Sequence, residues 1–73
     1  MYEDKKARAI ETWQRLLNYP EIRMSASEQY EELLRLAEEY CEEGFITREE
    51  RRAMIENATA NYRRAVEGMG QGT

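Results

Sequence analysis

Residues able to act as nucleophiles, general bases or metal ligands are scarce in this sequence. It contains no histidine, which removes the commonest general base and metal ligand of proteins. Its single cysteine, Cys41, falls on the apolar positions of its segment and is followed by Glu42 and Glu43. A nucleophilic thiol needs a positive, partly exposed site, whereas a free cysteine packs as a small hydrophobic residue. We therefore expect Cys41 to be a buried structural thiol.

Adjacent glutamates are the other candidates for chemistry. They form the pairs Glu31/Glu32, Glu38/Glu39 and Glu42/Glu43. Helical di-iron sites need inward-facing glutamates together with histidine ligands, and these glutamates lie away from the apolar positions. No glycine-rich loop precedes a helix with a following lysine, so a phosphate cradle is not supported. The sequence thus predicts no catalytic residue, no metal site and no cofactor, and the protein is not expected to be an enzyme.

An acidic group is the first candidate binding surface. Its members share one middle segment of the chain and are Glu28, Glu31, Glu32, Glu38, Glu39, Glu42 and Glu43. Two readings stay open. The group either keeps its face solvated, or it docks on a basic protein surface, including one that otherwise holds nucleic acid.

An arginine group is the second candidate surface. It consists of Arg48, Arg51 and Arg52, with Arg63 and Arg64 further along the chain. These side chains either pair with the acidic group or contact a phosphate or carboxylate of a partner. Arg48 falls at the positive end of its expected helix, where a cation is poorly placed. This position favours a partner outside that helix.

The elements that position these groups are three predicted helices. Apolar residues recur at helical spacing in three segments separated by Pro20 and by Gly44. The predicted helices cover about 4–18, 26–43 and 48–67, with a frayed glycine-rich tail over 68–73. We expect one domain over residues 1–73.

Helix starts are marked by capping residues. Asp4 is expected to cap the first helix. Ser25 with Glu28, and Thr47 with Glu50, have the spacing of capping boxes. The link between the second and third helices is short, so these two helices should form an antiparallel hairpin within an all-α, three-helix bundle.

Each helix is expected to carry one apolar face. The residues assigned to these faces are Ile10, Trp13, Leu17, Tyr30, Leu33, Leu34, Ala37, Tyr40 and Cys41, and then a short heptad seam of Ile55, Ala58, Tyr62, Ala65 and Met69. Ile22 and Met24 are expected to fold back onto the core. Leu16, Leu36 and Met54 lie at the edges of the faces, so we expect them to be half exposed and available to a second copy.

The hairpin region resembles a known family. Residues 33–55, centred on Gly44-Phe45-Ile46-Thr47-Arg48-Glu49-Glu50, are similar to the short C-terminal (SHOCT) helical hairpins of bacterial proteins. Those hairpins also join two helices through a Gly-apolar-Ile-Thr-x-Glu-Glu turn. An additional N-terminal helix carrying Trp13 and a longer last helix depart from that pattern. The resemblance implies an interaction or oligomerisation module without catalysis.

Charge and composition limit the kinds of ligand and the compartment that we expect. The net charge of −4 is concentrated in residues 26–46, which hold seven glutamates and one arginine, while both flanking segments have a small basic excess. Nucleic acid is therefore not expected as the main ligand. No apolar run is long enough to span a membrane, no signal peptide is apparent, and one cysteine forms no internal disulfide, so a reducing cytoplasm is expected.

Three functions remain as hypotheses. The first is a non-catalytic protein-interaction module that self-associates, with Leu36 and Met54 as contact candidates and a homodimer as its assembly. The second is a small bacterial or phage regulator that docks on a basic, nucleic-acid-handling protein through the acidic group. The third is a DNA-binding protein that uses the arginine-rich last helix.

Overall fold

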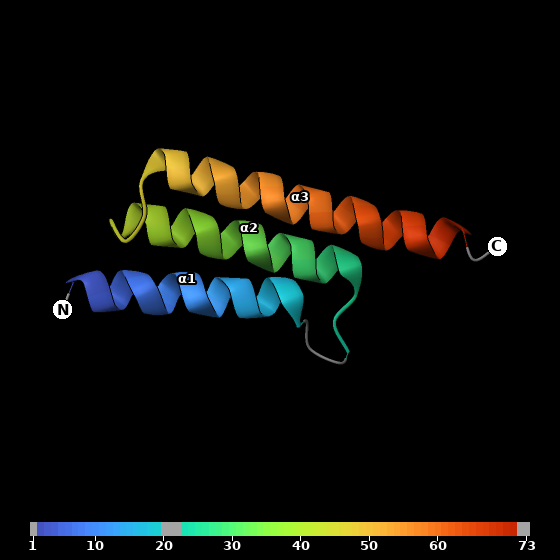
Figure 1. Ribbon diagram of the computed structural model, residues 1–73, viewed down its shortest axis with the longest axis horizontal. Coiled ribbons are helices and arrows are strands. Elements are labelled where there is room, and N and C mark those ends of the chain that lie inside the picture. The colour runs from blue at the N-terminus through green and yellow to red at the C-terminus, as the bar shows by residue number, and fades with distance from the viewer. Residues whose placement is uncertain (1, 20–22, 72–73) are drawn as a thin grey trace.

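Three helices follow one another along the chain (Figure 1). The computed structural model describes the backbone of residues 2–19 and 23–71, and side chains over 4–19 and 23–67. Its helices are α1 (Tyr2–Asn18), α2 (Ala26–Glu42) and α3 (Arg48–Gln71), and no strand occurs within those residues. The predicted all-α fold of three helices is therefore confirmed.

The start of α1 differs from the prediction. The helix begins at Tyr2, so Asp4 lies inside the first turn and is not the capping residue. A carboxylate in the first turn still faces the positive end of the helix, so its charge is well placed even though its capping role was wrongly assigned. At the other end of α1, the Tyr19 amide donates to the Arg15 carbonyl at 2.7 Å. Pro20, the expected terminator, lies outside the described residues.

Both ends of α2 follow local rules of capping. The Ser25 hydroxyl accepts from the Glu28 amide at 3.1 Å, while the Glu28 carboxylate accepts from the Ser25 amide, which completes the predicted capping box. After the C-cap, Glu43, Gly44 adopts a φ of +82°. The amides of Gly44 and Phe45 then donate to the carbonyls of Cys41 and Tyr40, which is the Schellman arrangement.

The turn leads directly into α3. The Thr47 hydroxyl accepts from the Glu50 amide at 3.1 Å and the Thr47 amide donates to the Glu50 carboxylate at 2.8 Å. This second predicted capping box is also confirmed. The predicted end of the helix was wrong, because α3 continues to Gln71 through Gly68 and Gly70. Glycine lowers helix stability by about 1 kcal/mol relative to alanine but retains its amide, so it does not by itself end a helix.

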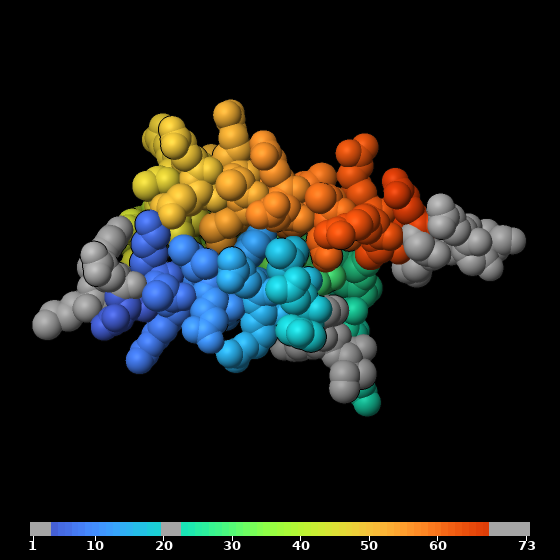
Figure 2. Space-filling view, viewed as in Figure 1, coloured from blue at the N-terminus to red at the C-terminus, as the bar shows by residue number. Residues whose placement is uncertain are grey.

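The three helices lie side by side with α2 in the middle, antiparallel to both neighbours (Figure 1). On the face shown in Figure 2, side chains of α1 and α3 meet in front of α2. An ion pair of 2.9 Å between Lys6 and Glu50 joins α1 to α3 at one end. The longer α3 extends past the other two helices at its C-terminal end. The hairpin of the second and third helices is thus observed.

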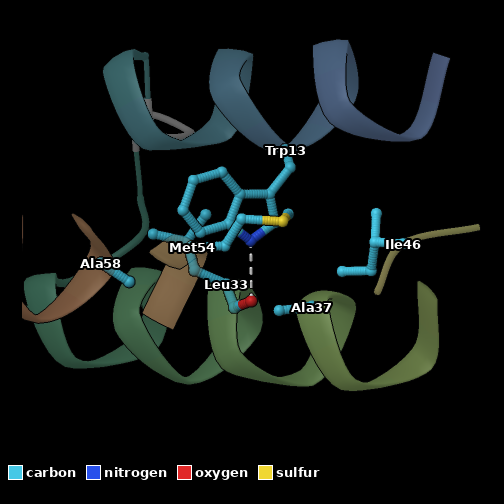
Figure 3. Close-up of a cluster of buried hydrophobic side chains, with 6 residues drawn as sticks. All are labelled: Trp13, Leu33, Ala37, Ile46, Met54 and Ala58. Carbon is cyan, nitrogen blue, oxygen red and sulfur yellow. Dashed lines mark hydrogen bonds between the residues drawn. The ribbon is translucent and has the colours of Figure 1, made fainter. Parts of the chain in front are cut away.

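The core lies where all three helices and the second turn converge (Figure 3). Its buried residues are Trp13, Leu33, Ala37, Ile46, Met54 and Ala58. Trp13 and Leu33 are the largest fully buried side chains, with 2% and 0% exposed. Ile46 was not predicted to belong to the core.

Met54 corrects the predicted edge of α3. It is only 8% exposed and packs beside the Trp13 indole, so it is not available to a second copy. The large indole fills the space between α1 and α3 and covers Met54, which a pattern read along α3 alone does not reveal. Leu16 and Leu36 are half-buried, as expected of edge residues.

The heptad seam of α3 faces its own bundle. Ala58 is buried at 1% exposure, Ile55 packs against the core, and the Tyr62 ring stacks on Tyr30 with 4.9 Å between centroids. The Tyr30 and Thr59 hydroxyls are 2.9 Å apart and share a hydrogen bond. The seam therefore forms the α2–α3 contact, although Tyr30 and Tyr62 are half-buried and not fully enclosed. The predicted places of Ile22 and of the Met69 side chain lie outside the described residues.

Candidate interaction surface

Three hydrogen bonds from two buried side chains fix α1 against α2. The Trp13 Nε1 donates to the Leu33 carbonyl at 2.8 Å (Figure 3). In the opposite direction, the Gln29 Nε2 donates to the carbonyls of Leu16 and Leu17, at 2.9 and 3.0 Å. Those carbonyls belong to the last turn of α1, which has no further amides of its own to satisfy them. Gln29, only 6% exposed, therefore caps α1 from a neighbouring helix.

A groove of about 310 Å³ runs along the side of this α1–α2 pair. Its apolar lining consists of Leu16, Tyr19, Met24 and Leu36, and its polar lining of Thr12, Arg15, Glu32 and Arg35. Tyr19 is 78% exposed and is the most exposed large hydrophobic residue among those described. Met24 is half-buried here and does not join the central core. Leu16 and Leu36, the two remaining edge residues, are brought together in this groove.

Charged side chains form the two edges of the groove. On α1, Arg15 pairs with Glu11 at 3.2 Å. On α2, Arg35 pairs with Glu32 and, at 3.0 Å, with Glu39. The hydrogen bond with Glu32, followed by the charge of that carboxylate, raises the pKa of Arg35. Each of these pairs stays within its own helix, so none closes the groove.

The acidic group is less uniform than its sequence suggests. Glu32 and Glu39 are both engaged by Arg35, which lies between them on α2. Glu38 faces the other way and approaches Arg51 of α3 at 4.0 Å. Glu31 and Glu42 are exposed. The predicted stripe is thus divided into an edge where Arg35 pairs with Glu32 and Glu39, and scattered carboxylates elsewhere.

The arginine group is also divided. Arg48 and Arg52 are exposed, whereas Arg51 is half-buried against α2. Its Nε is buried without a hydrogen-bond partner among the described atoms, and its guanidinium reaches only Glu38. Arg63 and Arg64 are exposed further along α3. Among the ion pairs of the described residues, the expected pairing between the arginine group and the acidic group is therefore limited to the 4.0 Å contact of Arg51 with Glu38.

Cys41 is half-buried, which corrects the prediction of a fully buried thiol. It lies beside Glu38, Glu42 and the arginines Arg48 and Arg51 at the edge of the α2–α3 contact. Cys41 packs against the core from the apolar side of α2, and its remaining surface lines a hollow among these polar side chains.

Two further pKa shifts follow from the fold near the hairpin turn. Hydrogen bonding to the Thr47 amide, and then to Lys6, lowers the pKa of Glu50. Burial, and then the charge of Glu39, raises the pKa of the Tyr40 hydroxyl. The Tyr40 ring centroid lies 6.4 Å from that of Phe45.

The described part of the chain offers neither a metal-binding group nor a membrane-spanning helix. No group of three or more cysteine or acidic side chains is arranged there to hold a metal ion. None of the described helices combines the length and apolarity that crossing a membrane requires.

Comparison with known proteins adds no relative. No protein-family model matches the chain, and no curated protein or solved structure is found to be similar to it. The similarity of residues 33–55 to SHOCT hairpins therefore stays a prediction.

Proposed function

We propose that this protein is a non-catalytic interaction module that self-associates through the groove between α1 and α2. The observation that carries this proposal is the partly exposed apolar lining of the groove. Leu16, Met24 and Leu36 are half-buried in this lining, and Tyr19, which also belongs to it, is 78% exposed. Apolar side chains gathered at one place and rimmed by polar residues are a recurring feature of protein-binding surfaces.

The size of the domain supports self-association. A chain of 73 residues buries a smaller fraction of its surface than a larger domain does, so covering apolar surface with a second copy adds needed stability. A symmetric dimer is the commonest assembly that achieves this, because it uses the same patch twice. The buried Met54 and the internal α3 seam now leave Leu16 and Leu36 as the predicted contacts.

The regulator hypothesis receives less support. Docking on a basic partner needs carboxylates gathered on one face, whereas Glu32 and Glu39 lie with Arg35 on one side of α2 and Glu38 faces Arg51 of α3. The DNA-binding hypothesis rests on Arg48 and Arg52, which are exposed, but the chain carries a net charge of −4. We therefore rank both hypotheses below self-association.

The proposal also includes a cytoplasmic location and a function without a cofactor. A cytoplasmic location is favoured by the single thiol, Cys41, since disulfides stabilise many small secreted domains. No cofactor, metal or membrane partner is included. The SHOCT-like turn would suit an oligomerisation module, and its Schellman arrangement and capping box are devices that hold any tight helical hairpin.

Sedimentation equilibrium across a wide concentration range tests the proposal. The wild type is expected to approach twice the monomer mass, and Leu36→Glu to remain monomeric. Because Leu36 also packs on the core, Tyr19→Glu provides a second variant at a largely exposed position. Ala53→Glu, exposed on α3, is the matched control and should dimerise like the wild type. A wild type that stays monomeric to high micromolar concentration would refute self-association.

A further inference from the structure

We infer that two copies pack groove to groove with their two-fold axis along the groove, so that α1 of each copy lies over α2 of the other. This inference rests on the proposed self-association and specifies its geometry. The geometry follows from the order of charged residues along the α1 edge and the α2 edge of the groove. The two edges can be compared residue by residue because hydrogen bonds fix the alignment of α1 with α2.

Hydrogen bonds between the helices define that alignment. Trp13 is level with Leu33, and Leu16 and Leu17 are level with Gln29. The helices are antiparallel, so moving toward the start of α1 corresponds to moving toward the end of α2. Counting from the Trp13–Leu33 contact, Glu11 is level with Arg35. By the same count, Arg8 is displaced from Glu39, and Arg15 from Glu32, by about one residue. One residue corresponds to ~1.5 Å along the helix axis.

The edges carry opposite charges at matching levels. Along α1 the order is Arg8, Glu11, Arg15, and along α2 at the same levels it is Glu39, Arg35, Glu32. At each of the three levels, the charge on α1 is therefore opposite to the charge on α2. Arg15, Glu32 and Arg35 line the groove, and Arg8, Glu11 and Glu39 continue the two charged rows along α1 and α2. Arg8, Arg15 and Glu39 are exposed and Glu32 is half-buried.

Symmetry decides which edges meet. An axis along the groove places the α1 edge of one copy against the α2 edge of the other and keeps each residue at the same level. Arg8 then faces Glu39 of the second copy, and Arg15 faces its Glu32. An axis across the groove at the level of Glu11 and Arg35 would bring the two α1 edges together and place Arg8 opposite Arg15 of the second copy. Like charges at an interface are strongly disfavoured, which selects the first arrangement.

The selected arrangement also agrees with helix packing. Since α1 is antiparallel to α2 within a copy, α1 is antiparallel to α2 of the second copy as well. The four helices then form an antiparallel four-helix arrangement, with the apolar floors of both grooves at its centre. Leu36 and Leu16 would approach their counterparts near the axis, enclosed by the three levels of charge pairs.

Charge reversal tests this geometry. Arg8→Glu and Glu39→Arg should each raise the dimer dissociation constant about tenfold, because two symmetry-related attractions become repulsions. The double variant Arg8→Glu/Glu39→Arg should recover an affinity within about threefold of the wild type. Arg64→Glu, exposed on α3, is the matched control for the change in net charge and should leave the constant unchanged. Helical circular dichroism of each variant shows that it is folded.

The outcomes separate this inference from the proposal beneath it. A dimeric wild type whose double variant fails to recover overturns the geometry alone. Tighter association of Arg8→Glu does the same, since it would mean that arginines face one another across the interface. A monomeric wild type contradicts self-association itself, and the geometry with it.

Discussion

The indole Nε1 of Trp13 donates a hydrogen bond of 2.8 Å to the Leu33 carbonyl, and both residues are almost completely buried. The partner of this bond is a backbone atom in the middle of α2, so the indole fixes the position of α1 along its neighbour. Gln29 does the same in reverse at the last turn of α1. The groove and the levels of its edges depend on these two contacts.

Trp13→Phe should lower the free energy of unfolding by about 2–3 kcal/mol. The substitution removes one hydrogen bond and leaves a small cavity beside Met54. Trp13→Ala should cost more, about 3–5 kcal/mol, which approaches the whole stability of a small domain. Urea titration followed by circular dichroism measures both. A cost below about 0.5 kcal/mol for the alanine variant would be typical of a surface residue and would contradict the core position of Trp13.

Gln29→Leu should destabilise the fold by about 1–3 kcal/mol, because the Leu16 and Leu17 carbonyls lose their donor while the site stays apolar. Gln29→Glu should be worse at neutral pH, since a carboxylate would face two carbonyl oxygens. In that variant the folded-state pKa of the new carboxyl would be raised, so the lost stability should return as the pH falls from the folded-state pKa to the unfolded-state pKa. Urea titrations of both variants at neutral and acidic pH would show this difference. A cost for Gln29→Glu that does not change with pH would contradict the capping role.

Glu50 should contribute to the acid sensitivity of the protein. Its pKa is lowered in the folded state by the Thr47 amide and by Lys6, so its stabilising contribution is present above the unfolded-state pKa and is lost as the pH falls through the folded-state pKa. Glu50→Gln should therefore show a smaller loss of stability between neutral and acidic pH than the wild type. Lys6→Gln should reduce this loss of stability by a smaller amount than Glu50→Gln does. The Thr47 amide, which lowers the Glu50 pKa more than Lys6 does, is still present in that variant. Equal losses in all three proteins would refute this assignment.

Gly44→Ala should cost about 1 kcal/mol. Gly44 has a φ of +82°, and a Cβ added there would meet no atom within 4 Å, so the cost is conformational and not steric contact with neighbours. Gly44→Asn should cost less, since asparagine tolerates this backbone region better than alanine. Thermal or urea unfolding of the two variants compares them directly. An alanine variant as stable as the wild type would mean that the turn can adopt another conformation.

Local signals in the sequence predicted the fold well. The capping pairs Ser25/Glu28 and Thr47/Glu50 and the terminator Gly44 act within a few residues, and each is observed. Leu33, Ala37 and Trp13 were placed in the core from their spacing alone. Asp4 and the end of α3 were misassigned because a cap and a fraying end depend on small energies that neighbouring residues can outweigh.

Contacts between segments could not be read in the same way. Met54 looked like an edge residue on α3, but the Trp13 indole from α1 covers it. Gln29 was overlooked because it is polar, although its spacing of four from Leu33 and eight from Ala37 places it on the apolar face. Of the candidate contacts, Leu36 stayed half exposed. The groove itself depends on how two helices pack, which spacing along one helix does not specify.

The location of the proposed dimer contact is tested most directly by a dilution series of amide correlation spectra of the wild type. From millimolar to low micromolar concentration, the amides of Thr12, Arg15, Tyr19, Met24 and Leu36 should shift together along one dissociation curve, while those of Arg48 and Arg52 stay constant. Spectra that do not change with concentration, or changes confined to α3, would contradict the account of the α1–α2 groove as the surface through which this protein self-associates.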